Sequence, residues 1–307
     1  MERKEWLEAR KRGLGGSDIA AILGVSPWAT PMDVYLDKHG MVEDEDSPSK
    51  LRGRIFERPI ADYFAEKNGV EITPAGLFQG PRPFMIGSPD FWVNTPGETE
   101  TWGLEIKTSR SDKGWGPEGT DRIPPYYATQ VHWYMLVTNK KHWDLMVYFT
   151  LRDEFRQYRV YADEELHENM LNKASEWWQK HIVEGERPSL DGGTGSKQLL
   201  NMTFPEDNGL ARGPEDRELE LFKELHSINE ALNTLKVRKE ETVNLIKEQM
   251  GEACEVSNMF SKVTWKLGAG RRSFDTKTFR KDHPELAEQY TKVSEPSRTF
   301  RFTYTEE

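Results

Sequence analysis

The stretch Gly87-Ser88-Pro89-Asp90, followed by Gly103-Leu104-Glu105-Ile106-Lys107, decides how this sequence is interpreted. Asp90 follows one short apolar run, and the acid–x–lysine triplet lies inside the next. Residues i and i+2 of a strand face the same side of a sheet, so a strand here points the Glu105 and Lys107 side chains together. The pattern predicts a strand pair that brings two carboxylates and one ammonium to one place.

Carboxylates that hold Mg²⁺ can activate a water molecule and stabilise charge on a leaving oxygen during phosphodiester hydrolysis. Asp90 and Glu105 are the candidate ligands, with the backbone carbonyl of Ile106 as a third, because Mg²⁺ prefers oxygen ligands and keeps several waters. Lys107 beside them is placed to orient the attacking water. The alternative is that Glu105 and Lys107 form an exposed ion pair of little energetic value.

The composition narrows the class of protein. The chain has 307 residues, 36% of them hydrophobic and 31% charged, which is enough for one large domain plus a smaller one. No apolar run approaches the roughly 20 residues of a membrane helix, and we expect no secretory signal. The single Cys254 excludes an internal disulfide and a cysteine-ligated metal centre, so a reducing cytoplasm is the expected setting. The net charge of -10 argues against a coat of nucleic acid but allows a local basic track.

The first half of the sequence alternates helices and strands. Ser17 is expected to cap a helix over 18–23, and Thr30-Pro31 to begin the next. The order of elements predicts an α/β (α+β) layer fold with a mixed sheet. The remaining expected elements are helices over 52–67, 124–138 and 163–184, and strands over 71–78, 83–87, 90–94, 102–108, 143–150 and 155–161.

The composition changes at residues 187–213, where Pro, Gly, Ser, Asp and Asn dominate. This predicts a linker between a core at 1–186 and an extension at 214–307. The extension begins with a long helix ending near Met250, and a strand pair, two short helices and a last strand over 298–304 follow. Its long helix carries a heptad seam of five apolar residues: Leu221, Leu225, Ile228, Leu232 and Leu235.

Further motifs accompany the strand pair, in a fixed order along the chain. They are Trp6-x-x-x-Arg10 with Gly13-Leu14-Gly15-Gly16-Ser17-Asp18, Arg52-Gly53-x-x-x-Glu57, Gly114-Trp115-Gly116 with Ile123-Pro124, and Tyr127-x-x-Gln130-Val131-x-x-Tyr134. Together with the opening stretch, they resemble the phage-type exonucleases of the YqaJ / lambda-exonuclease family, within the PD-(D/E)xK nuclease superfamily. The resemblance covers about residues 6–185. It implies a restriction-endonuclease-like PD-(D/E)xK core, a mixed sheet flanked by helices, to which the C-terminal helical arm and small sheet are added.

The resemblance implies a catalytic role for five matched residues. Asp90 and Glu105 would bind Mg²⁺, with Mn²⁺ able to substitute, and Glu57 would assist at a second metal. Lys107 would position the attacking water. Gln130 would help to hold that water or the lysine. The alternative for Glu57 is an ion pair with an arginine of its own helix.

The resemblance also implies a site for the DNA end. Arg10, Ser17 and Ser88 fall where relatives grip the 5′-phosphate, for which a guanidinium and two hydroxyls are apt donors. Ser17 as a simple helix cap, and Tyr134 as a core aromatic, are the alternatives at those positions.

By this resemblance the protein is a Mg²⁺-dependent 5′→3′ double-strand DNA exonuclease of phage or prophage recombination in a bacterial cytoplasm. Its implied partners are double-stranded DNA ends, a single-strand annealing protein and further copies of itself in a ring-shaped trimer. Two alternatives stay open: an endonuclease or structure-specific nuclease with the same metal site, and a non-catalytic DNA-binding recombination scaffold. The extension at 214–307 is expected to contact the partner, another subunit or DNA.

Overall fold

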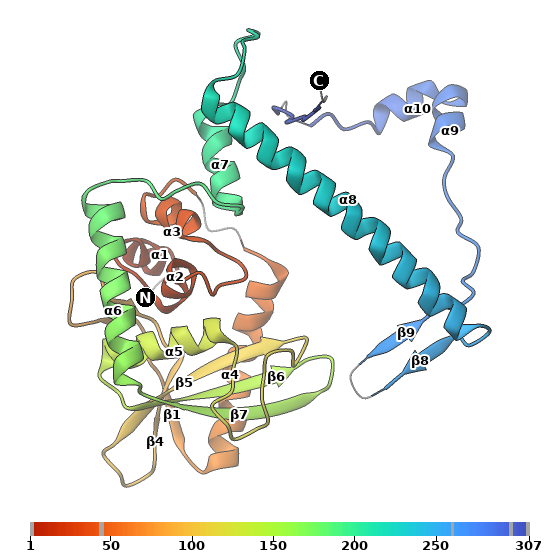
Figure 1. Cartoon of the computed structure of the whole chain (residues 1–307). Helices are drawn as coiled ribbons and strands as arrows, with labels where there is room; N and C mark the ends of the chain where they lie inside the picture. The colour runs from red at the N-terminus through yellow and green to blue at the C-terminus, as the bar shows by residue number, and fades with distance from the viewer. Residues whose placement is uncertain (1–2, 43–45, 259–260, 295–296, 305–307) are drawn as a thin grey trace. The chain divides into compact units, whose positions relative to one another are not determined.

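The computed structural model describes residues 3–42, 46–258, 261–294 and 297–304. The chain divides into two compact units, Met1–Thr203 and Phe204–Glu307 (Figure 1). No described helix combines the length and the apolar content that crossing a lipid bilayer requires.

A five-stranded mixed sheet forms the centre of the N-terminal unit, in the order β1-β4-β5-β6-β7. β5 and β6 are parallel and the other neighbours antiparallel. A parallel pair needs a crossover connection, which helix α5 supplies. The mixed sheet flanked by helices is therefore confirmed. The strands are β1 (Glu71–Pro74), β4 (Phe91–Asn94), β5 (Thr101–Ser109), β6 (His142–Phe149) and β7 (Glu154–Tyr161).

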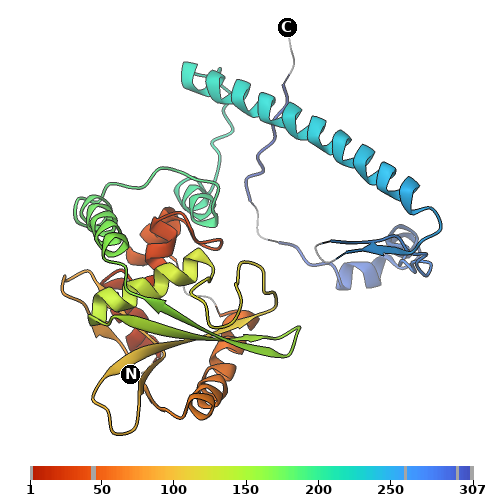
Figure 2. The same cartoon turned by 60° about the horizontal axis from the view of Figure 1, so that its bottom comes forward.

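Helices cover both faces of this sheet (Figure 2). On one face α4 (Pro48–Asn68) packs Ile60 and Phe64 against Leu104 and Ile106. On the other face α5 (Pro125–Thr138) packs against β6 and β7. Because side chains alternate along a strand, burial of Leu104 and Ile106 beneath α4 turns the intervening Glu105 toward the α5 face.

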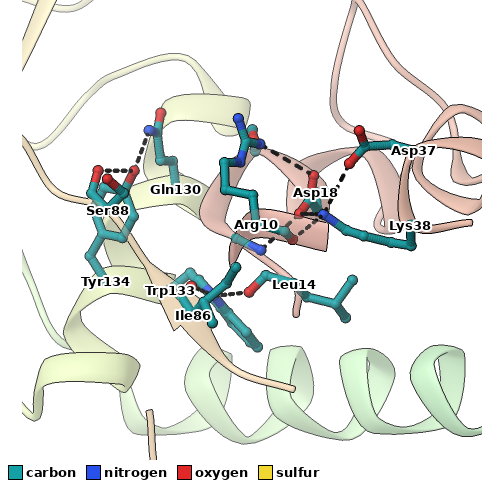
Figure 3. Close-up of polar contacts among 12 residues, drawn as sticks. Arg10, Leu14, Asp18, Asp37, Lys38, Ile86, Ser88, Gln130, Trp133 and Tyr134 are labelled. Atoms are coloured by element: carbon teal, nitrogen blue, oxygen red, sulfur yellow. Dashed lines mark hydrogen bonds and ion pairs between the residues drawn. The ribbon is translucent and has the colours of Figure 1, made fainter. Parts of the chain in front are cut away.

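A helical layer completes the N-terminal unit and packs on the far side of α5. The layer is joined to α5 by the indole N–H of Trp133, which donates to the carbonyl oxygens of Leu14 (3.0 Å) and Ile86 (2.9 Å) (Figure 3). This joins the segment between α1 and α2 to β3. The further elements are α1 (Arg3–Lys11), α2 (Gly16–Ile22), α3 (Pro31–Lys38), β2 (Phe78–Gln79), β3 (Ile86–Gly87), α6 (Glu164–Trp178) and a π-helical turn at Gln179–Val183.

Three local expectations meet different outcomes. Thr30 caps α3 as predicted, with its side chain accepting from the Asp33 amide. Ser17 as a helix cap is wrong, because Gly15 occupies that position and the Asp18 carboxylate accepts its amide at 2.8 Å. Residues 194–203, expected in the linker, form helix α7 (Thr194–Thr203), which is tied to α3 by the Gly195 amide donating to Asp33.

The C-terminal unit contains one long helix and a two-stranded sheet. The helix is α8 (Asp216–Met250), and Gly251 ends it with a φ of 54°. The strand expected over 298–304 is wrong, because the described residues 297–304 contain none. The smaller elements are β8 (Glu255–Ser257), β9 (Lys262–Thr264), α9 (Thr276–Asp282) and α10 (Pro284–Gln289).

Candidate active site

Strand register brings the opening motifs together. Phe91 pairs with Leu104 across the antiparallel β4–β5 ladder, so Asp90, one residue earlier, comes opposite Glu105. The Ile106 amide donates to Asp90 Oδ2 at 2.8 Å. The N–H and C=O of one strand residue point to the same edge, so the Ile106 carbonyl also faces the side where β4 has ended.

Glu105 is the most enclosed acid of this group, with only 2% of its surface exposed. Its Oε1 accepts from Lys107 Nζ at 2.5 Å and from Gln130 Nε2 at 2.8 Å. Its Oε2 is also buried and has no hydrogen-bond partner among the described residues. A buried carboxylate oxygen without a donor is costly, so this atom suits direct contact with a cation.

The site crowds negative charge into a place with little water. Burial raises the pKa of Glu105 to about 8, with the Asp90 carboxylate adding to the effect. Burial and Asp90 likewise raise the pKa of Glu57 to about 7, and burial raises that of Asp90. Although burial opposes it, Glu105 and Asp90 hold the pKa of Lys107 above its usual value. A divalent cation here would relieve the repulsion among the carboxylates.

The donor set fits a metal that keeps much of its water. Within the described part of the chain, no three acidic, histidine or cysteine side chains come close enough to enclose an ion by themselves. Mg²⁺ does not require this, because it is usually bound through one or two carboxylates plus waters. Asp90, Glu105 and the Ile106 carbonyl are the residues that would hold it, and Glu57 lies near enough to interact electrostatically with Asp90.

Gln130 and Tyr134 lie one turn apart on α5, and Tyr134 contacts Ser88 in the segment before β4 (Figure 3). Gln130 extends this link to Glu105. Gln130 Nε2 donates to Glu105 Oε1 and to the Tyr134 hydroxyl, both at 2.8 Å. The Tyr134 hydroxyl donates to the Ser88 carbonyl at 3.3 Å. Gln130 therefore contacts Glu105 rather than Lys107, and Tyr134 has a polar contact beyond its packing role.

A glycine allows α2 to approach this part of α5. A Cβ atom added at Gly16 would lie 2.8 Å from Gln130 Cγ and 3.0 Å from its carbonyl oxygen. Both contacts are tighter than van der Waals packing accepts, so the helices can touch here only without a side chain at residue 16. Gly16 of the N-terminal motif thus allows α2 to pack directly against Gln130.

The residues expected at the DNA end open onto the same space as the carboxylates. A cavity of about 210 Å³ is lined by Arg10, Ser17 and Ser88 together with Asp90, Glu105 and Gln130. Arg10 Nη2 donates to Ser17 Oγ at 3.2 Å.

A second cavity of about 820 Å³ also includes Arg10, Ser88, Asp90 and Glu105 in its lining, and adds Glu57, Ile106 and Lys107. Every residue expected in the site lines one or both cavities.

Some details depart from what the motifs imply or add to it. The helix arginines near Glu57 form their ion pairs with other acids, Arg54 with Asp46 and Arg58 with Asp62. Lys107 Nζ lies 5.0 Å from the ring centre of Tyr127, a matched residue to which no role was given. The Trp6 side chain of the first motif lies outside the described part of the structure.

Lys38 is a residue that the motifs missed altogether. Its side chain is fully buried beside Asp18. A lysine in the last turn of a helix is ordinarily explained by the helix dipole, so its sequence position alone gave no signal of burial.

The fold and the site define a mixed α/β protein with an acid–lysine cluster in the middle of β5, beside the beginning of β4. More particularly, residues 5–141 match the family model of the YqaJ-like viral recombinase domain. A relative, the uncharacterized protein YqaJ of Bacillus subtilis (strain 168), is 28% identical over 312 residues. That alignment covers 98% of this chain and 94% of the relative, and so extends through the C-terminal unit.

Solved structures of similar fold include two exonucleases. LHK-Exo, an alkaline exonuclease from Laribacter hongkongensis determined in complex with dAMP, has a TM-score of 0.49 at 18% identity, covering 65% of this chain and 97% of that one. A phage-related exonuclease from Haemophilus somnus 129PT has a TM-score of 0.42 at 14% identity, covering 57% of this chain and 96% of that one.

Proposed function

We propose that this protein is a Mg²⁺-dependent double-strand DNA exonuclease that digests from the 5′ end, in phage or prophage recombination in a bacterial cytoplasm. The observation that carries the proposal is Glu105 Oε2, a buried carboxylate oxygen without a donor among the described residues, beside Asp90 and Lys107. A site of this composition suits hydrolysis of a phosphodiester bond, and the YqaJ-like viral recombinase domain agrees with DNA as the substrate.

The chain's own residues divide the work of such a reaction. Bound Mg²⁺, or Mn²⁺ in its place, would supply an activated water and stabilise charge on the leaving oxygen. Gln130 and Lys107 both hold Glu105 Oε1, which fixes the carboxylate and leaves Oε2 for the cation. Lys107 remains protonated because of Glu105 and Asp90, so its ammonium is a donor to the attacking water or the phosphate.

The direction of digestion, from the 5′ end, would come from the neighbouring hydrogen-bond donors. Arg10, Ser17 and Ser88 line the same small cavity as Glu105, so a terminal phosphate held by them lies next to the carboxylates. A 5′ end anchored there presents the first phosphodiester bond to the metal site, while the complementary strand is left intact.

Digestion of a linear duplex labelled at either end tests this proposal, with and without Mg²⁺ and with and without a 5′-phosphate. We expect Mg²⁺-dependent release of nucleotides from the 5′ end, abolished by Lys107→Ala in a folded protein. Efficient nicking of closed circular DNA would instead favour an endonuclease. Binding of DNA without cleavage by the wild-type protein would favour a recombination scaffold.

We also propose that the C-terminal unit binds a protein partner, and that this partner is a single-strand annealing protein. The supporting observation is the heptad seam of α8, where Leu221 is 44% exposed, Ile228 48% and Leu235 60%. An exposed apolar seam of this spacing is typical of a helix that packs against another helix.

Removal of residues 204–307 tests this partner proposal. The truncated protein should keep its nuclease activity and lose capture of the annealing protein. Light scattering of both proteins distinguishes this from a ring of identical copies, which is the competing use of the seam. Unchanged capture would contradict the proposal.

A further inference from the structure

A buried ion pair lies next to Arg10, one of the proposed phosphate-binding residues (Figure 3). The Lys38 side chain is fully buried, and its ammonium lies 2.7 Å from Asp18 Oδ2 and 3.2 Å from Asp37 Oδ2. It also donates to the Arg10 carbonyl oxygen at 3.1 Å. An ammonium has three donors, so these contacts satisfy it completely.

Lys38 acts on Arg10 from two directions. It holds the Arg10 main chain directly, through the carbonyl oxygen of Arg10 in the last turn of α1, which also accepts from the Gly13 amide at 3.4 Å. It reaches the guanidinium through Asp18, whose Oδ1 lies 3.8 Å from Arg10 Nη2. The same nitrogen donates to Ser17 Oγ, so the contacts form one continuous network that ends at the small cavity.

The charge of Asp18 makes Lys38 necessary in this place. Asp18 is buried, and Lys38 and Arg10 hold its pKa below the usual range despite burial, so the group is a carboxylate. A carboxylate next to a phosphate site repels the phosphate, and it competes for the guanidinium that the phosphate needs. A buried ammonium against the opposite oxygen removes most of both effects.

We propose that Lys38 is a positioning residue for recognition of the DNA end. By neutralising Asp18 it weakens the competition of this carboxylate with a terminal 5′-phosphate for the Arg10 guanidinium, and so sets the preference for phosphorylated ends. This inference rests on the proposed function of the Arg10 site. The competing explanation is that the ion pair only stabilises the packing of α1, α2 and α3.

The two explanations predict different effects on end recognition when the lysine or the aspartate of the ion pair is replaced. If the pair is only structural, removing either charge is harmful, because it leaves the other buried without a partner. If Lys38 protects the phosphate site from Asp18, then only loss of the lysine harms end recognition. Removing both charges should then restore it.

The experiment compares the full-length wild type with Lys38→Met, Asp18→Asn and the double variant, on linear duplexes with a 5′-phosphate or a 5′-hydroxyl. We expect Lys38→Met to lower the phosphate-to-hydroxyl ratio of kcat/KM by about tenfold or more, through KM. Asp18→Asn should keep or raise the ratio, and the double variant should return to within about threefold of the wild type. Lys67→Met breaks the exposed pair with Glu118 and serves as the matched control without effect.

Binding in EDTA provides a second readout that needs no catalysis. Fluorescence anisotropy of the same duplexes should show tighter binding of the phosphorylated end by the wild type and loss of that difference in Lys38→Met. A wild type that binds both ends alike, an unchanged ratio in Lys38→Met, or a lowered ratio in Asp18→Asn would each overturn the inference. If Lys38→Met does not fold, Asp18→Asn and the double variant still decide it. Absence of digestion with intact phosphate-dependent binding would overturn the proposed function alone.

Discussion

Glu105 and Asp144 are buried carboxylates on neighbouring strands, and their surroundings are opposite. Asp144 is fully buried on β6, where Arg159 donates to both of its oxygens at 2.7 Å and Trp102 Nε1 adds a third bond at 2.8 Å. Glu105 on β5 receives both of its donors at one oxygen, and Oε2 receives none from the part of the chain that is described. The fold therefore satisfies one acid completely and leaves the other incomplete.

The difference extends to charge. Asp144 faces a single guanidinium in a bidentate pair, the strong geometry for arginine and carboxylate. Glu105 faces Lys107 but also Asp90 and Glu57, which raise its pKa. A carboxylate that only holds strands together has no need of like-charged neighbours, so the crowding at Glu105 supports the proposal that a cation binds there.

Replacing each acid by its amide makes the comparison directly testable, and the largest effect is expected at Glu105. Glu105→Gln should lower DNA digestion by at least about 1,000-fold, because the amide removes the charge that would hold the proposed metal. The same change should leave thermal stability equal or higher, because it relieves repulsion with Asp90. Initial rates and thermal unfolding measure the two effects. Retained digestion, or a clear loss of stability, would contradict the assignment of Glu105 as a ligand.

The matched change at Asp144 should have the reverse outcome. Asp144→Asn sets an amide against Arg159 and should lower the free energy of unfolding by about 2–3 kcal/mol. The cost stays below that of a fully enclosed pair because the Arg159 side chain is 39% exposed and can reach water. Denaturant unfolding gives the stability, and digestion well below the unfolding temperature should stay within about threefold of the wild type. Loss of activity in a stable protein would mean that Asp144 belongs to the site.

How much of this contrast can be predicted from the sequence depends on how far apart in the sequence the interacting residues are. Period-two alternation was enough to place Glu105 and Lys107 together, because that relation is local. Asp144 belongs to none of the motifs, although it lies directly opposite Arg159 in the β6–β7 hairpin and the hairpin register pairs the two. Glu57 and Gln130 were found only by resemblance, since α4 and α5 reach the strand from opposite faces of the sheet.

Two of the wrong expectations and the burial of Lys38, which the motifs do not indicate, share a physical reason. Residues 194–203 look like a linker by composition, and their helix is tied to α3 by the Gly195–Asp33 contact. Ser17 looks like a cap, but Asp18 takes over that function from inside the helix. The burial of Lys38 depends on the packing of three helices. In each case a contact between elements decides the outcome, and local patterns do not contain it.

The pH dependence of stability gives a third, smaller test of the contrast. In the metal-free protein the folded-state pKa values of Glu105, about 8, and Glu57, about 7, lie above the usual 4.5. Between these values the unfolded chain has released protons that the folded chain keeps, so stability falls as pH rises from about 4.5 to about 8. We expect a loss on the order of 2 kcal/mol, with Mg²⁺ raising the melting temperature more at pH 8 than at pH 5.

His132 changes stability with pH in the opposite direction, so its contribution must be separated from that of Glu105 and Glu57. Burial lowers the pKa of His132 to about 4, so its contribution is present above pH 6.5 and is lost as pH falls toward 4. The measured quantity is therefore the difference between the wild type and Glu105→Gln at each pH. That difference should shrink toward pH 5, and equal melting curves at pH 8 would contradict the raised pKa.

The smallest expected effect concerns the link from Glu105 to Ser88. Tyr134→Phe removes the hydroxyl that accepts from Gln130 and donates to Ser88, while Gln130 keeps its bond to Glu105. We expect a loss of about 1 kcal/mol in stability and of about 3–10-fold in kcat/KM, because the amide that orients Glu105 loses one of its two anchors. Tyr158→Phe is the matched control, since its buried hydroxyl donates to the Gly116 carbonyl at 2.8 Å outside this link. It should cost similar stability without the loss of rate, and equal rates in both variants would show that Tyr134 supports the fold and not the site.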